Sequence, residues 1–283
     1  MPTIISRAGH CARNVRCAHH NAGTTTPMRT ASVRPSSGTP SRADSARPGQ
    51  STAAASAAVQ SADVIRRSWL DHLEHRGRQR VGEYFVAARE AGGPELGLAL
   101  DCHGRLNLKN AIRLCRALED LGLIFAEEPV PPENADVLAE VQKHTSIPIA
   151  AGERWATIYG VREFIEKHAV DILQCDLVNC GGFTGMKKIA TLAEAHYISM
   201  APHNPNGPLA TVMNLHFAAT IPNFLILETI GSRSDDELAQ ELMSHRLVLD
   251  GGYLGVPEEP GFGVDMNEQA FAKFPYYPHE GSR

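Results

Sequence analysis

The sequence lacks several features that would point to whole classes of proteins. No apolar run approaches the roughly 20 residues that a membrane-spanning helix needs. The formal net charge is only −5 and the isoelectric point is near 6.2, which argues against nucleic acid or an anionic membrane as a partner. The six cysteines are scattered without a C-x-x-C pair or zinc-ligand spacing, which favours reduced thiols in a cytoplasmic protein. What remains is a globular protein, because 283 residues with 43% apolar content suffice for one large barrel or two ordinary domains.

Residues 1–60 differ in composition from the rest of the chain. They contain seven arginines, no lysine and a single acid, Asp44, and they show no sustained apolar period of 2 or 3.6. Such a stretch cannot bury enough apolar surface to offset the entropy lost on ordering, so we expect it to be disordered. Two interpretations of its origin stay open. The segment is either an organelle transit peptide, which would change the expected location, or non-native sequence from a wrong start or reading frame.

From residue 61 to about residue 246 the sequence pattern becomes typical of regular secondary structure. Apolar residues from Val64 to Leu73 share one helical face, and a second helix around Tyr84 to Ala91 ends at Gly92-Gly93-Pro94. A unit of apolar strand, polar turn and amphipathic helix then repeats about every 25 residues, which is the cadence of a (β/α)₈ barrel. The predicted strands cover 98–101, 124–127, 147–150, 171–176, 197–202 and 224–228, and the predicted helices cover 109–121, 158–168, 184–196 and 208–219.

The predicted fold class is therefore α/β, an incomplete (β/α)₈ TIM-type barrel. Only six strands are found where a closed barrel needs eight, and residues 1–60 offer no candidate for the other two. The last segment, 247–283, is rich in glycine and proline. We expect it to return and pack outside the barrel.

Three carboxylates lie at equal intervals along this repeat. Asp101, Glu127 and Glu153 each follow a short apolar run, and each lies 26 residues after the one before. Because that interval matches one strand plus its helix, the three acids should lie at the C-terminal ends of neighbouring parallel strands. Carboxylates this close repel one another unless a cation lies between them, and all-oxygen ligation suits Mg²⁺ or Mn²⁺. The shared spacing carries this prediction, since a single strand-end acid is often solvated or caps the next helix.

The same strand-end positions continue with Asp176, His203 and Glu228, and His103 lies two residues after the first acid. His203 is the candidate base for removing a proton next to a carboxylate, because imidazole titrates near neutral pH. Asp176 could accept a hydrogen bond from its other ring nitrogen and fix the tautomer. His103 could donate a proton to a departing hydroxyl, and Glu228 could contact the substrate or the oxygen on which charge develops.

Two neighbouring side chains are ambiguous. Strict alternation along a strand would turn Glu128 to the face opposite Glu127, where it would support the site or lie at the surface. Arg154, next to Glu153, could form a salt bridge or bind the substrate.

The sequence resembles the enolase superfamily in six motifs, which occur in the expected order. They are D-C-H-G-R from Asp101, E-E-P-V from Glu127, G-E-R at 152–154, Asp176 followed by Gly181-Gly182, P-H-N-P at 202–205 and P-E-E-P-G-F-G at 257–263. The resemblance spans roughly residues 80–270 and is nearest to the mandelate racemase subgroup, in particular to sugar-acid dehydratases of the D-galactonate dehydratase type. It implies that the six strands are strands three to eight of an enolase-type barrel over 61–246. By resemblance, Mg²⁺ ligands are implied at Asp101, Glu127 and Glu153, a base dyad at His203 and Asp176, an acid at His103 and an electrophilic contact at Glu228, with Arg154, Glu228 and His203 facing the substrate.

The implied reaction removes water from an aldonate to give a 2-keto-3-deoxy sugar acid. His203 would take the C2 proton and His103 would protonate the leaving 3-hydroxyl. The pairing of a His base with Mg²⁺ is one that enolase-type enzymes use. Two alternatives stay open. The chain is a racemase or epimerase in which His103 is a second base, or an inactive barrel fragment, since no capping domain and no first two strands are recognisable. A small sugar acid is the expected partner, and a homo-oligomer is left open.

Overall fold

The structure is a computed structural model that describes residues 14–19, 30–32, 75–229, 241–244, 246–250 and 252–273. The chain divides into two compact units, and each is described by itself. The first unit comprises Met1–Pro27, Glu153–Val161 and Leu173–Arg283, and the second comprises Met28–Gly152 and Arg162–Ile172. Two of the boundaries between the units fall within helix α5 (Ile158–Glu166) and strand β6 (Ile172–Leu173).

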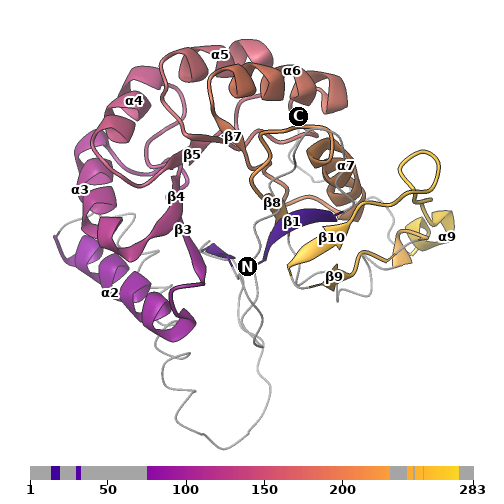
Figure 1. The fold of residues 1–283 in the computed structure, drawn as a ribbon, viewed down its shortest axis with the longest axis horizontal. Coiled ribbons are helices and arrows are strands. Elements are labelled where there is room, and N and C mark those ends of the chain that lie inside the picture. Colours follow the sequence, from indigo (N-terminus) through magenta and orange to yellow (C-terminus); the bar gives the residue numbers. More distant parts are fainter. Residues whose placement is uncertain are drawn as a thin grey trace, which may run out of the picture. The chain divides into compact units, whose positions relative to one another are not determined.

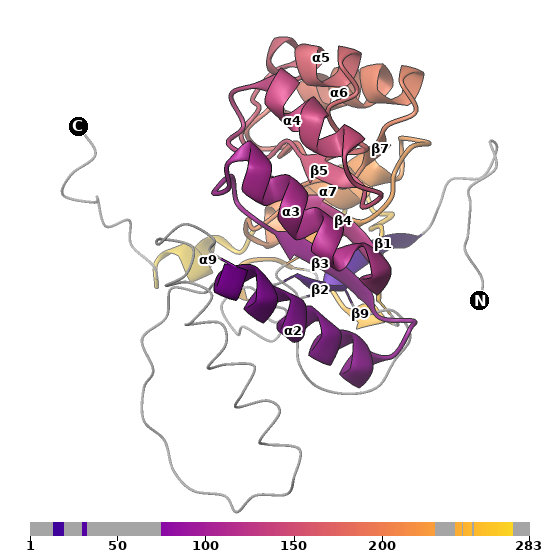
Figure 2. The same cartoon turned by 90° about the vertical axis from the view of Figure 1, so that its left-hand side faces the viewer.

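The second unit is a parallel sheet covered by helices. Strands β2 (Thr30–Ser32), β3 (Gly97–Asp101), β4 (Leu123–Glu127) and β5 (Ile149–Ala151) pair in that order, all in parallel. Helices α2 (His75–Gly92), α3 (Leu108–Leu118) and α4 (Ala135–Lys143) pack against one another in chain order, as Figure 2 shows. All five residues of β3 are buried, as expected for a central parallel strand.

Local sequence explains where these helices begin and end. The side chains of Asn107 and Asn134 accept hydrogen bonds from the first turns of α3 and α4, which is N-capping. A 3₁₀ turn (Glu119–Leu121) extends α3 and ends at Gly122, which adopts the left-handed conformation (φ 60°). The apolar face of α3 is buried through Ala111, Leu114, Cys115 and Leu118.

The first unit contains the later strands and helices. Strand β7 (Ser199–Met200) continues the parallel pattern, since Ala201 N–H donates to Leu173 O at 3.0 Å. Helices α6 (Gly182–Ala195) and α7 (Pro208–Ala218) precede β8 (Leu227–Thr229). A Cβ at Gly185 would lie 1.9 Å from Cys180 O, so the first turn of α6 requires glycine there.

A second, four-stranded sheet in this unit has the order β8-β1-β10-β9. Strand β1 (Asn14–His19) pairs in parallel with β8 and antiparallel with β10 (Tyr253–Gly255), which follows β9 (Leu249–Asp250); Figure 1 shows β8, β1 and β10 side by side. The C-terminal segment also contains helix α9 (Glu268–Phe271). The part of this segment around Phe262 packs on α6 and α7. The Phe262 ring stacks on that of Phe183, with 5.8 Å between the ring centroids, and the Phe262 carbonyl oxygen lies 3.0 Å from His216 Nε2.

The prediction of an α/β fold built from parallel βα units is confirmed. The structure differs in several details. Strands β6 and β7 have two residues each, shorter than the apolar runs predicted, and α4 fills a stretch between 127 and 147 where no helix was assigned. Strands β1 and β2 lie within residues 1–60, where the sequence offers no candidate strand, because such short runs without apolar alternation are identified only by their pairing.

Two other predictions concern residues that the structure does not describe. The first predicted helix, from Val64 to Leu73, lies outside the described residues, as does most of the segment that we expect to be disordered. Among the helices that the structure does describe, none combines the length and the apolar character needed to cross a bilayer.

Candidate active site

In the second unit, Asp101 and Glu127 end adjacent parallel strands and lie directly opposite each other in register. Both side chains are buried, with exposed fractions of 5% and 6%. The loops that follow are joined by two backbone hydrogen bonds, from Cys102 N–H to Glu127 O at 2.9 Å and from Gly104 N–H to Glu128 O at 2.8 Å. Two buried carboxylates side by side are costly unless positive charge compensates them.

The turn after β3 is shaped by the first of these acids. Asp101 Oδ1 accepts a hydrogen bond from the His103 N–H at 2.9 Å, and His103 adopts positive φ (51°). The surroundings of the turn are negative. Burial raises the pKa of the Cys102 thiol well above its usual value, and Cys115, Asp101, Glu127 and Glu128 raise it further.

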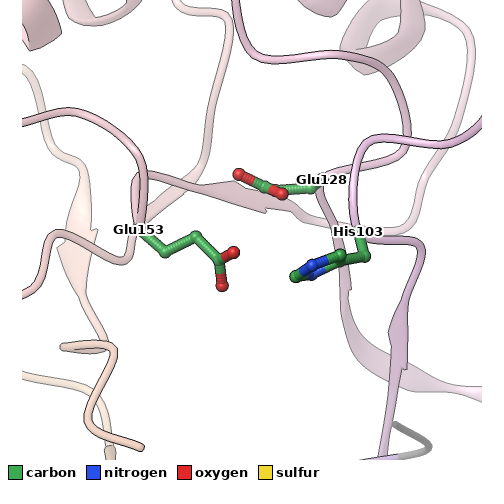
Figure 3. A group of neighbouring side chains, drawn as sticks. All are labelled: His103, Glu128 and Glu153. Atoms are coloured by element: carbon green, nitrogen blue, oxygen red, sulfur yellow. The ribbon is translucent and has the colours of Figure 1, made fainter. Parts of the chain in front are cut away.

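The structure decides between the two interpretations of Glu128. Its side chain is buried, since the exposed fraction of Glu128 is 2%. A carboxylate oxygen of Glu128 and a ring nitrogen of His103 lie within 4.8 Å of each other, so both could act as metal ligands. Figure 3 shows these two side chains on the loops after β3 and β4. The surface interpretation of Glu128 is wrong because β4 ends at Glu127, and Glu128 adopts positive φ (39°), so the alternation of an extended strand no longer applies.

In the first unit, the His203 ring lies between two carboxylates. Its Nδ1 is 2.9 Å from Asp176 Oδ2, and its Nε2 is 3.2 Å from Glu153 Oε2. The side chain of His203 is 11% exposed, that of Glu153 8% and that of Asp176 1%. The hydrogen bond expected between Asp176 and His203 is therefore present, and the roles of both residues stay predictions.

Asp176 is held by four hydrogen-bond donors. Its Oδ1 accepts from the backbone N–H groups of Val178 at 2.8 Å and Asn179 at 3.4 Å, while Oδ2 is 2.9 Å from both His203 Nδ1 and Asn206 Nδ2. Burial by itself would raise the pKa of this carboxyl. The hydrogen bonds from His203, Asn206 and Val178 outweigh burial, so the pKa of Asp176 lies below its usual value.

Glu228 lies in β8 and contacts the residue after His203. Its Oε2 accepts a hydrogen bond from Asn204 N–H at 2.8 Å, and its backbone carbonyl accepts from Asn204 Nδ2 at 3.1 Å. The fully buried Asn204 also donates to Thr211 Oγ1 at 3.0 Å, which joins the loop after β7 to α7. Of the two interpretations of Arg154, the structure shows the ion pair, with Nε 3.5 Å from Glu153 Oε1.

Two residues were not identified from the sequence as parts of this chemistry. Asn204 and Asn206 donate to predicted catalytic carboxylates, whereas Glu128, for which support of the site was one of the two interpretations, contributes a buried carboxylate beside His103. The sequence holds a weak signal for the two asparagines, since both belong to the P-H-N-P-N-G loop between a strand and a helix. Amides occur in loops for many other reasons, so that signal does not single them out.

Residues 52–270 match the family described as Enolase C-terminal domain-like, which is more than half of the chain. The chain belongs to this family, and the predicted membership in the enolase superfamily is confirmed. A D-galactonate dehydratase family member of Streptomyces bingchenggensis is 35% identical over 196 residues, covering 69% of this chain and 47% of the relative. The D-xylonate dehydratase of Haloferax volcanii is 36% identical over 199 residues, covering 70% and 48%.

Solved structures agree with this assignment. The crystal structure of a member of the enolase superfamily from Salmonella Typhimurium is 31% identical, with a TM-score of 0.68, covering 71% of this chain and 52% of that one. The chain spans about half the length of the relatives that it matches.

Proposed function

We propose that this chain carries the catalytic groups of a Mg²⁺-dependent sugar-acid dehydratase, acting on an aldonate such as a galactonate. The observation that carries the proposal is the partly buried His203 held at 2.9 Å by Asp176, in a chain of the Enolase C-terminal domain-like family. The names of its relatives, D-galactonate and D-xylonate dehydratase, support the class of reaction. The substrate would be a small acidic sugar derivative.

Asp101, Glu127 and Glu153 fit a divalent cation by the chemistry of their donors. The first two are buried carboxylates paired across β3 and β4, and Glu153 is the second residue after β5, the strand next to β4. An all-oxygen ligand set suits Mg²⁺, with Mn²⁺ as an alternative. When bound, the cation would supply positive charge beside the carboxylate of the substrate.

The chain's own residues would move the protons. His203 takes the proton from C2, while Asp176 keeps the imidazole in the required orientation and tautomer. His103 gives a proton to the 3-hydroxyl, the C3–O bond breaks and water leaves. The resulting enol then becomes the 2-keto-3-deoxy acid. Glu228, held by Asn204, contacts the oxygen on which negative charge develops, and Arg154, paired with Glu153, also binds the substrate.

The test is to incubate the full chain with Mg²⁺ and a panel of aldonates, and to measure the 2-keto-3-deoxy product. We expect product with at least one aldonate, and none with the His203→Asn variant or with excess chelator. A folded chain that binds Mg²⁺ but forms no product from any aldonate would refute the dehydratase proposal. Uptake of solvent deuterium at C2 without loss of water would instead assign the chain to the racemase or epimerase class.

A further inference from the structure

Asp176 is contacted by two side chains of one short loop. His203 Nδ1 and Asn206 Nδ2 both lie 2.9 Å from the same oxygen, Oδ2. The two residues are three positions apart in the loop between β7 and α7. One carboxylate oxygen therefore holds the predicted base and a second residue of the base's own loop.

The rest of the loop is anchored elsewhere. Between the two residues, Asn204 faces Glu228 and Thr211, with hydrogen bonds of 2.8 to 3.1 Å. After Asn206, the N-cap position of α7 is occupied by Gly207, and the helix begins at Pro208. The N-cap residue therefore forms no side-chain hydrogen bond to the first turn of α7. Asn206 is thus the residue that ties the later half of this loop to Asp176.

The other oxygen of Asp176 is held differently. Oδ1 accepts from backbone N–H groups at 2.8 and 3.4 Å, which keep that oxygen fixed to the start of its own loop. On Oδ2, both contacts come from side chains. The Cβ–Cγ torsion of a carboxylate is soft, because terminal sp³–sp² torsions are broad, and a rotation about it displaces both oxygens. A second donor on Oδ2 restricts that rotation.

We propose that Asn206 is a positioning residue, which keeps Asp176 Oδ2 directed at His203 Nδ1 and so keeps the imidazole aimed at the substrate. The proposal rests on the proposed function for its effect on catalysis. In this role Asn206 acts on the imidazole through its contact with Asp176. Hydrogen-bond partners of this kind, one step removed from a catalytic or ligating group, commonly change activity by about 10- to 100-fold when removed.

The kinetic test compares Asn206→Leu, which keeps the approximate size and removes the donor, with Asn206→Gln, which keeps an amide. We expect kcat to fall about tenfold in Asn206→Leu, with KM changed less than about twofold, and partial recovery of kcat in Asn206→Gln. The control Asn110→Leu makes the same chemical change on α3 and should leave kcat unchanged. Wild-type kcat in Asn206→Leu, or an equal loss in both Asn206 variants, would overturn the proposal.

A spectroscopic test separates this proposal from the proposed function. In the full chain without substrate, the Nδ1–H proton signal of His203 is assigned by its loss in His203→Asn. We expect this signal to shift upfield and broaden in Asn206→Leu, because the hydrogen bond to Asp176 is less well held. An unchanged signal would refute the positioning role. A shifted signal in a chain whose wild type forms no product supports the positioning role and counts against the dehydratase proposal alone.

Discussion

Replacing Asp176 by asparagine should abolish the ability of His203 to accept a proton at Nε2. The backbone N–H groups of Val178 and Asn179 require an acceptor, so the new amide oxygen should take the place of Oδ1. The new NH₂ group then faces His203 Nδ1, which must become an acceptor. The ring proton moves to Nε2, where Glu153 Oε2 at 3.2 Å accepts it. The nitrogen that should receive the C2 proton is then already protonated.

The expected loss in kcat is about 10⁴-fold, the size seen when an orienting carboxylate becomes an amide and fixes the wrong histidine tautomer. The assay is product formation from the best aldonate, with the tautomer read independently from the ¹⁵N shifts of His203. Asn206 can turn its amide to present an oxygen to the new NH₂, so the fold should persist. A variant with the Nδ1–H tautomer retained, or with kcat within tenfold of wild type, would refute this reasoning.

The same residue gives a pH dependence of stability. Because the folded-state pKa of Asp176 is lowered, its hydrogen bonds stabilise the fold fully above the unfolded-state pKa of about 3.9, and this contribution is lost as pH falls through the lower folded-state pKa. The free energy of unfolding of wild type should therefore exceed that of Asp176→Asn at pH 6, and the difference should shrink below about pH 4. A difference that stays constant from pH 6 to pH 3, measured by urea unfolding, would contradict the lowered pKa.

Three further predictions concern the fold and the cation site. Leu114→Ala, at a fully buried position of α3, should lower the free energy of unfolding by about 2–5 kcal/mol in urea titration, and a loss below about 1 kcal/mol would contradict its place in the core. Burial raises the pKa of Cys115 to about 12 and that of Cys180 to about 11. Iodoacetamide at pH 8 should therefore label both thiols far more slowly in the native chain than in guanidinium. Equal labelling rates, measured by peptide mass spectrometry, would show that the two thiols are accessible. Glu127→Gln should weaken Mg²⁺ binding more than about tenfold in calorimetry, whereas the exposed Glu163→Gln should not, and unchanged affinity would exclude Glu127 as a ligand.

The spacing of the strand-end carboxylates could be predicted from the sequence because it is a property of the covalent repeat. A strand plus a helix has a characteristic length, so Asp101 and Glu127 were expected at neighbouring strand ends, and the structure pairs them in register. The contact between Asp176 and His203 follows from the same reasoning for a later pair of units. Helix α3 was predicted from its apolar period and its terminating glycine, both of which are local signals.

Only the tertiary structure decided which side chains complete the site. Glu128 becomes buried beside His103 because the backbone turns to positive φ as soon as β4 ends, and a pattern of alternation cannot register such a turn. Asn206 meets Asp176 because the loop after β7 folds back onto the preceding one, and β1 is a strand because β8 and β10 pair with it. Periodicity reports how each segment buries its own apolar face, whereas the partners of loop donors and short strands are set by segments far away in the chain.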